Sequence, residues 1–184
     1  RIAFDICPVN TVLNDLAAKT GVPYDREGEI ARSGKTDEKL LAALNALEYY
    51  RRRPPKSLGR EWLSREFYPE LEKQALGIPD LMRTVCDHIS VQVSQAVLHD
   101  PSRTMLVTGG GAYNAFLIDG IRNTTRVHVA IPGHDLVKFK EALVFALLGV
   151  LRWRGEPNCL SSVTGASADS SGGVIYQGPA KPLV

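Results

Sequence analysis

The stretch that decides the fold is MLVTGGGAYN, at residues 105–114, where an apolar run leads into three consecutive glycines. The apolar run predicts a strand, and Asn114 belongs to the residue types that cap a following helix. Gly109, Gly110 and Gly111 carry no side chains, so the backbone of this turn can approach a ligand closely, and the helix start offers free amides to an anion. This pattern is typical of a nucleotide cradle, but the local sequence alone equally allows a tight turn without a ligand.

The rest of the chain alternates between predicted strands and predicted helices. Short apolar or alternating runs predict strands at residues 2–6, 104–108 and 126–131. Apolar residues at helical spacing predict helices at residues 10–19, 59–67, 79–98, 114–122 and 135–154, and one from residue 36 to the prolines of 51–57. Strands separated by helices indicate an α/β layer architecture. Because three strands are few for so much helix, we expect part of the sheet to lie upstream of Arg1.

Several boundaries are predicted from single residues. Asn10 and Thr36 are expected to cap the helices that they begin, and Pro79 suits the first turn of the long helix. Pro and Gly punctuate residues 22–35 without a visible period, which predicts a loop. The last helix carries a run of apolar side chains, namely Phe139, Leu143, Ala146, Leu147, Val150 and Leu151.

Length, composition and charge exclude several classes of protein. The chain has 184 residues, of which 44% are hydrophobic and 23% charged, values that are ordinary for a globular domain and argue against disorder, collagen and coiled coil. Lys and Arg number 22 and Asp and Glu 20, so the net charge of +2 gives no electrostatic case for binding nucleic acid or an anionic membrane. No apolar run approaches the ~20 residues that a membrane span needs.

Cysteine and histidine usage indicates a reducing compartment and argues against a metal site. Cys7, Cys86 and Cys159 are odd in number and far apart, which fits neither a disulfide framework nor a zinc site and indicates the cytoplasm. The four histidines share no metal-binding spacing. The chain starts at Arg1 within a predicted strand and shows no signal peptide, so we expect it to be a fragment of a longer protein.

The segment FDICPVN, at residues 4–10, carries a second candidate site. Asp5 lies near the carboxyl end of a predicted strand, where ligands of open α/β sheets bind, and a carboxylate there can act as a general base or hold a metal-bound water. From the residues alone, a capping or loop-bracing role for Asp5 is favoured. Cys7 lies close by, but no histidine partner for it is identifiable, which argues against a thiolate nucleophile.

The segment PPKSLGRE, at residues 54–61, carries a third candidate. Lys56 and Arg60 are residue types that meet phosphate or a carboxylate, although a solvated loop capped by Ser57 is the favoured interpretation. Glu141 lies on the last predicted helix between apolar neighbours, where an ordinary flanking charge also fits.

Taken in order, these segments resemble the anhydro-N-acetylmuramic acid kinase family of bacterial peptidoglycan recycling, and the resemblance extends along nearly the whole chain. The family pattern FDTGPGN is met by residues 4–10, PPKSTGRE by residues 54–61 and CGGGAxN by residues 108–114. An EA pair in the last long helix is met at Glu141, and a closing PGNLPSVTGA is met by residues 157–166. Several motifs at compatible spacings are far more specific than any one of them.

The resemblance implies an actin-like sugar-kinase fold (ASKHA, ribonuclease H-like) with two α/β domains around a cleft. Residues 1–184 resemble only the C-terminal half, a partial sheet flanked by helices, without the family's phosphate-loop domain. We therefore expect half of the ATP site and half of the sugar site here, and no activity from this chain alone. The family further suggests a homodimer.

The resemblance also implies a reaction, in which ATP, Mg²⁺ and water convert 1,6-anhydro-N-acetylmuramic acid into N-acetylmuramic acid 6-phosphate. Asp5 maps onto the family aspartate that takes a proton from water as the water attacks the anomeric carbon. The 6-oxygen released from the ring accepts the γ-phosphoryl group, with Mg²⁺ offsetting the charge. The remaining assignments are Gly109, Gly110, Gly111 and Asn114 for nucleotide binding, and Asn10 and Glu141 for substrate binding.

The chain departs from the family pattern in the aspartate motif. Ile6, Cys7 and Val9 replace Thr, Gly and Gly, which stiffens the loop and bears on the shape of the sugar pocket. Asp5 and Asn10 are retained, so the family activity is favoured. Two alternatives stay open: an ordinary sugar kinase of the same fold that leaves an anhydro ring closed, and a non-catalytic sugar- or nucleotide-binding relative.

Overall fold

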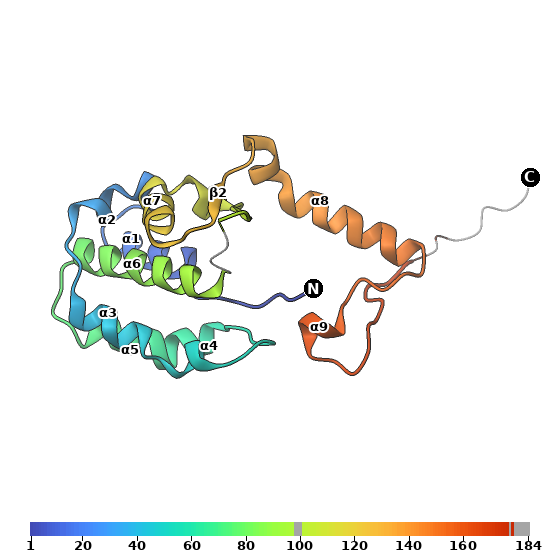
Figure 1. Cartoon of the computed structure of the whole chain (residues 1–184), viewed down its shortest axis with the longest axis horizontal. Helices are drawn as coiled ribbons and strands as arrows, with labels where there is room; N and C mark the ends of the chain where they lie inside the picture. The colour runs from blue at the N-terminus through green and yellow to red at the C-terminus, as the bar shows by residue number, and fades with distance from the viewer. Residues whose placement is uncertain (98–100, 177, 179–184) are drawn as a thin grey trace, which may run out of the picture.

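The helix α6 (Ile78–Ala96) lies at the centre of the molecule. In this computed structural model, which describes residues 1–97, 101–176 and 178, helices from both sides of α6 in the sequence pack against it (Figure 1). The helices packed against α6 are α1 (Asn10–Ala18), α2 (Glu29–Ser33), α3 (Glu38–Asn45) and α7 (Ala115–Thr124). The long helix with Pro79 in its first turn is thereby confirmed.

The hydrophobic core consists of side chains that α6 shares with these neighbours. On α6, Leu81, Val85 and Ile89 lie at every fourth position and are buried, as the apolar spacing predicts. The same cluster includes Val12, Leu16, Leu40, Leu44, Leu117 and Ile118. Burying each such side chain contributes roughly 1.5–3 kcal/mol, so this cluster is the main source of stability.

Two of the predicted helix caps are wrong. Asn10 is already the first helical residue of α1, and no side-chain bond caps that helix. Helix α3 begins after Asp37, whose carboxylate accepts the Leu40 amide at 2.7 Å, while the Thr36 hydroxyl donates to Asp87 at 2.5 Å instead. A carboxylate is the stronger cap here because its negative charge also faces the positive end of the helix dipole.

The loop predicted at residues 22–35 contains two short helical elements, a 3₁₀ turn (Arg26–Gly28) and α2. Asp25 fixes the start of α2, because its carboxylate accepts the amides of Ile30 at 2.8 Å and Ala31 at 3.0 Å. With 5 residues, α2 is too short to show an apolar period in the sequence.

The helix predicted at residues 59–67 is confirmed and continues further. It consists of α4 (Arg60–Trp62), a π-helical turn (Leu63–Phe67) and α5 (Tyr68–Glu72). A 3₁₀ turn (Glu48–Arg51) and the proline-rich segment precede it. These elements lie along the same side of α6 as α3 (Figure 1).

The sheet consists of two parallel strands, β1 (Thr104–Leu106) and β2 (His128–Ala130), joined through α7. Met105 lies opposite Val129, so the apolar side chains of both strands are in register. Both strand predictions are confirmed, although the strands are shorter than predicted. The α/β class is confirmed as well, with helices around a small parallel sheet.

The strand predicted at residues 2–6 is wrong. This segment pairs with no strand in the part of the chain that the structure describes, and the Asp5 amide instead donates to the carbonyl oxygen of Lys56 at 3.3 Å, in a loop. An apolar segment forms a strand only where a neighbouring strand completes its hydrogen-bond ladder, and the described sheet contains only β1 and β2.

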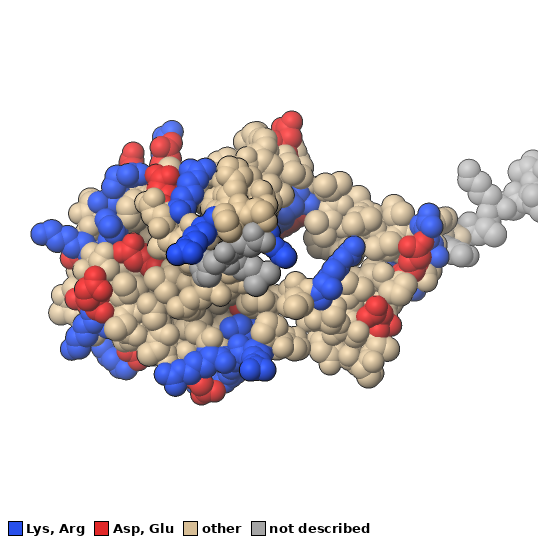
Figure 2. Space-filling model, viewed as in Figure 1, with Lys and Arg blue, Asp and Glu red and all other residues tan. Residues whose placement is uncertain are grey.

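The last long helix, α8 (His134–Trp153), is confirmed but extends away from the other helices (Figure 1). Six large apolar side chains on it are between 54% and 78% exposed, namely Phe139, Leu143, Phe145, Leu147, Val150 and Trp153. Figure 2 shows a mainly uncharged surface along α8. We refer to these six side chains as the α8 apolar face. Five of the six lie within about 120° around the helix and Phe145 lies outside that arc; large exposed apolar patches mark interaction sites.

His88, on α6, makes the folded state sensitive to acid. Its Nδ1 lies 2.7 Å from Asn45 Oδ1 and its Nε2 lies 2.9 Å from the Tyr50 hydroxyl, and burial lowers the pKa of His88 from 6.5 to about 3. In the unfolded chain His88 takes up its proton near pH 6.5. The free energy of unfolding is therefore independent of His88 above that pH and decreases as the pH drops further. By about pH 5 the expected loss is about 2 kcal/mol.

Urea unfolding at about pH 7.5 and about pH 5 measures this loss. In the variant His88→Gln the free energy of unfolding should lose the pH dependence that His88 causes. Only the pH dependence from the other titratable groups should remain. Equal pH slopes for the two proteins would contradict a neutral, buried His88.

Candidate functional site

The glycine turn, residues 109–111, joins β1 to α7. Only its first residue has a backbone conformation that favours glycine. Gly109 has φ of +80°, in the left-handed region that favours glycine, and Gly110–Tyr113 form a 3₁₀ turn. Asn114 then caps α7, accepting the Leu117 amide through its side-chain oxygen at 3.0 Å. The predicted tight turn and the predicted cap are both confirmed.

A pocket of about 490 Å³ opens beside the glycine turn, a size in the range of small-molecule sites. The turn lies directly against the Asn10 side chain of α1: a Cβ added to Gly110 would lie 3.3 Å from Asn10 Nδ2, and one added to Gly111 would lie 3.3 Å from Asn10 Oδ1. The structure therefore brings together Asn10, Gly110, Gly111 and Asn114, all of which line the pocket. We call this the first pocket.

The opposite wall of the first pocket comes from the segment that the sequence predicts to be a loop. Arg26 and Glu27 line it, and Glu27 has φ of +54°, which is uncommon for a residue with a side chain. Gly28 holds this segment against α7, because a Cβ there would lie 2.4 Å from both Asn114 Oδ1 and Phe116 Cβ. Sequence reasoning misses this wall, and the one signal for it is the glycine at position 28.

A second pocket, of about 430 Å³, lies beside the same turn and includes Gly109, Gly110 and Glu141 in its lining. The N-terminal part of α8 forms its other side, where His134 Nδ1 lies 2.9 Å from the Tyr113 hydroxyl. Glu141 is thus placed beside the glycine turn, in a pocket that also contains Lys138 and Lys140. Gly110 and Tyr113 line both pockets.

Asp5 lines neither pocket and lies against residues 49–58 instead. Its carboxylate accepts the Leu58 amide through Oδ2 at 2.8 Å, and its backbone carbonyl accepts the Tyr49 hydroxyl at 2.5 Å. Among the described residues, Asp5 Oδ1 has no hydrogen-bond partner, and the side chain is exposed. Asp5 can therefore accept a proton from a bound molecule through a carboxylate whose orientation is fixed.

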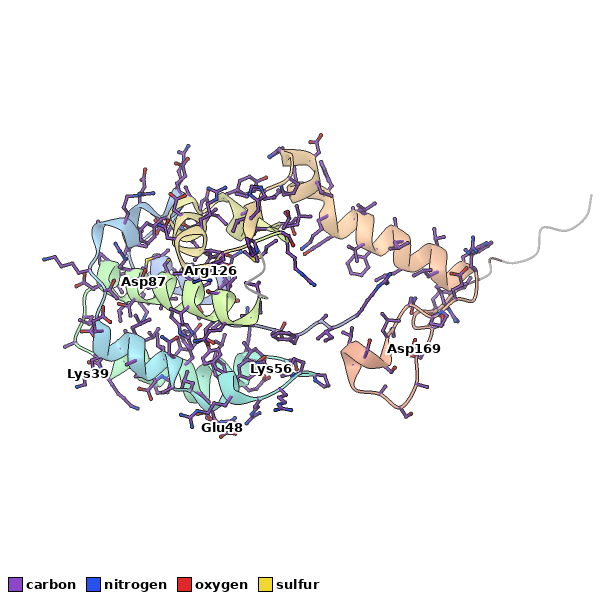
Figure 3. The ribbon with its side chains drawn as sticks, viewed as in Figure 1. Lys39, Glu48, Lys56, Asp87, Arg126 and Asp169 are labelled. Carbon is purple, nitrogen blue, oxygen red and sulfur yellow. The ribbon has the colours of Figure 1, made fainter. Side chains whose placement is uncertain are left out.

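Lys56, labelled in Figure 3, lies on the loop and accepts the Asp5 amide through its backbone carbonyl. Its ammonium group is 4.5 Å from the centre of the Tyr49 ring and 5.6 Å from that of Phe4, and burial lowers the pKa of Lys56. Ser57 does not cap the following helix, since Gly59 occupies the N-cap of α4 without a side-chain bond. The PPKSLGRE segment thus contacts the Asp5 segment through Lys56 and Leu58, while its other residues, Arg60 among them, are exposed.

The closing motif reaches the same loop. Helix α9 (Ser161–Thr164) ends at Gly165, whose φ is +77° and whose added Cβ would lie 3.1 Å from Pro55 Cγ. Asp169 fixes this turn by accepting the amide and the hydroxyl of Ser161, both at 2.7 Å, and these bonds lower the pKa of Asp169.

Comparison with known families decides the assignment. The model of the family described as anhydro-N-acetylmuramic acid kinase matches residues 1–178. The chain belongs to this family. Similar proteins that carry the same description include one from Methylobacterium nodulans, 35% identical over 94% of this chain and 46% of the relative, and one from Roseobacter denitrificans, 36% identical over 97% and 48%. A relative from Sulfurovum sp. is 33% identical over 95% and 50%.

This member of the anhydro-N-acetylmuramic acid kinase family spans about half the length of the curated relatives it matches. Within the described residues, no helix combines the length and the apolar character that crossing a bilayer requires. Burial raises the pKa of the Cys7 thiol to about 12, so Cys7 offers no thiolate beside Asp5 near neutral pH.

Proposed function

We propose that the chain is the C-terminal half of an ATP-dependent kinase that converts 1,6-anhydro-N-acetylmuramic acid and water into N-acetylmuramic acid 6-phosphate. The observation that carries this proposal is Asp5, an exposed carboxylate with one oxygen fixed by the Leu58 amide and the other without a described partner. Family membership suggests the identity of the sugar substrate. The Asp5 carboxylate is the base that attack by water on this sugar requires.

In the proposed reaction Asp5 accepts a proton from the water molecule that attacks the anomeric carbon. The new bond joins the water oxygen to that carbon, and the bond from the carbon to the 6-oxygen breaks. The 6-oxygen then takes the γ-phosphoryl group of ATP, and ADP leaves. A carboxylate suits this role because it is ionised near neutral pH and can hold the proton in the transition state.

The first pocket is the proposed nucleotide site. Gly110 and Gly111 form a cradle that any side chain would narrow, and Asn114 starts a helix of 10 residues directly behind it. Free amides at such a start suit phosphate oxygens. Mg²⁺ bound together with ATP would offset the charge of the phosphates.

The α8 apolar face supports the two-domain part of the proposal. Its six side chains are each more than half exposed, and the curated relatives are about twice as long as this chain. We propose that the other half of a family-length protein covers this face and completes an actin-like sugar kinase. By family-length protein we mean a polypeptide of the relatives' length that contains these 184 residues.

The experiment compares this chain alone with the family-length protein, each supplied with ATP, Mg²⁺ and the anhydro sugar. The family-length protein should turn over, and the isolated chain should not, because the phosphate-binding half is needed to position the reacting groups. Turnover of the isolated chain near ~10 per second, a typical enzyme rate, would contradict the half-kinase proposal.

A further inference from the structure

Asp5 is held at three places by one short stretch of chain. Its amide donates to the Lys56 carbonyl at 3.3 Å, its carbonyl accepts the Tyr49 hydroxyl at 2.5 Å, and its Oδ2 accepts the Leu58 amide at 2.8 Å. Since residues 1–9 lie outside every described strand, these bonds replace the ladder that would otherwise fix the segment.

Tyr49 is rigid enough to serve as a fixed point. It is only 2% exposed, and its ring packs at 5.3 Å from Trp62 and at 5.6 Å from Tyr50, measured between ring centres. Burial, together with the nearby negative charge of Asp5, raises the pKa of Tyr49 to about 12. The hydroxyl therefore stays protonated, and stays a donor, under all ordinary assay conditions.

The two contacts act on different parts of Asp5. The Tyr49 hydroxyl fixes the peptide plane that follows the Cα of Asp5, and the Leu58 amide fixes the rotation of the carboxylate. An exposed aspartate without such contacts samples several rotamers, and loss of the productive one lowers the rate of proton transfer.

We propose that Tyr49 and the Leu58 amide are positioning groups for Asp5, so that the tyrosine and the PPKSLGRE segment aim its Oδ1 at the attacking water. This inference rests on the proposed role of Asp5 as general base. It gives the PPKSLGRE segment a role that its sequence, which favours a solvated basic loop, does not predict.

The first test is Tyr49→Phe in the family-length protein. We expect kcat to fall about 10-fold, the size of one lost hydrogen bond, with KM for ATP unchanged. Tyr50→Phe is the matched control: it removes the neighbouring hydroxyl, which bonds His88 instead of Asp5, and should leave kcat within about twofold. Equal kcat values for the two variants would overturn the role of Tyr49.

The second test removes only the backbone donor. Leu58→Pro deletes the amide hydrogen that Asp5 accepts. Leu58→Ala shortens the side chain but keeps this hydrogen, so only the proline variant should have a lower kcat. Equal activity of the two folded variants would overturn the role of the Leu58 amide. The Tyr49→Phe comparison remains decisive if the proline variant does not fold.

A double-mutant cycle separates this inference from the proposed function. In an Asp5→Asn background, Tyr49→Phe should cost nothing further, because the tyrosine acts through the carboxylate. A further 10-fold loss there would overturn the positioning role while leaving Asp5 as the base. If Asp5→Asn alone retains wild-type activity, the proposed function itself fails.

Discussion

Asp5→Asn in the family-length protein is expected to lower kcat by about 10²–10⁴-fold, the usual loss when a general base is removed. Asparagine keeps the shape of the side chain, and its amide oxygen can still accept the Leu58 amide, which Asp5 Oδ2 accepts at 2.8 Å. The asparagine amide has no basic oxygen for the proton of water. Steady-state kinetics, together with titration of an ATP analogue, should therefore show lost turnover with nearly unchanged nucleotide affinity.

Asp15→Asn is the control for this experiment. Asp15 is an exposed carboxylate on α1 that accepts the Tyr68 hydroxyl and lines neither pocket. Its change to asparagine should leave kcat within a few-fold of wild type. A rate for Asp5→Asn as close to wild type as that of the control would return Asp5 to a loop-bracing role.

Gly110→Val is expected to weaken nucleotide binding about 100-fold, or roughly 2.7 kcal/mol, while the protein still folds. Gly110 lines both pockets, so a branched side chain there enters the space that the nucleotide needs. The fold should tolerate it, because the nearest atom to an added Cβ is Asn10 Nδ2, at 3.3 Å and at the end of a flexible side chain. The left-handed backbone that valine would strain belongs to Gly109.

Melting without ligand and calorimetric titration with an ATP analogue measure the two effects separately. Gly77→Val is the matched control, since a Cβ there would make only an ordinary contact, 3.7 Å from Pro79 Cδ, away from both pockets. It should leave the affinity unchanged. If Gly110→Val lowers the melting temperature but binds the analogue as the control does, the glycine turn is structural and the nucleotide assignment is wrong.

The long helices and both described strands were predictable because each carries a clear local signal. The apolar spacing on α6 and the alternation around Val129 are read from a few neighbouring residues, and the Asn114 cap depends on a single side chain. The segment at residues 2–6 has an equally good local pattern but no partner strand in the described chain. Strand formation depends on a neighbour, which a local pattern does not contain.

The predicted site residues are divided among three places: Asp5 lines neither pocket, Glu141 lines the second pocket, and Asn10, predicted to bind the substrate, lines the first. The glycine turn, Asn10 and Asn114 do line one pocket, but its other wall, at Arg26 and Glu27, depends on a packing contact of Gly28. Tyr49 carries no motif at all, and its contact with Asp5 joins residues that are 44 positions apart. Contacts between residues so far apart in the sequence follow from the packing of the whole chain, which no local pattern contains.

Product analysis in water enriched in heavy oxygen tests the central claim most directly. The family-length protein, with ATP and 1,6-anhydro-N-acetylmuramic acid, should yield a ring-opened 6-phosphate with one heavy oxygen at the anomeric carbon and none in the phosphate. As a control, unlabelled product is incubated in the same enriched water for the same time, which measures the spontaneous exchange of oxygen at the anomeric carbon. A phosphorylated sugar that keeps its anhydro ring, or heavy oxygen found only in free phosphate, would contradict attack by water on the sugar and with it the role proposed for Asp5.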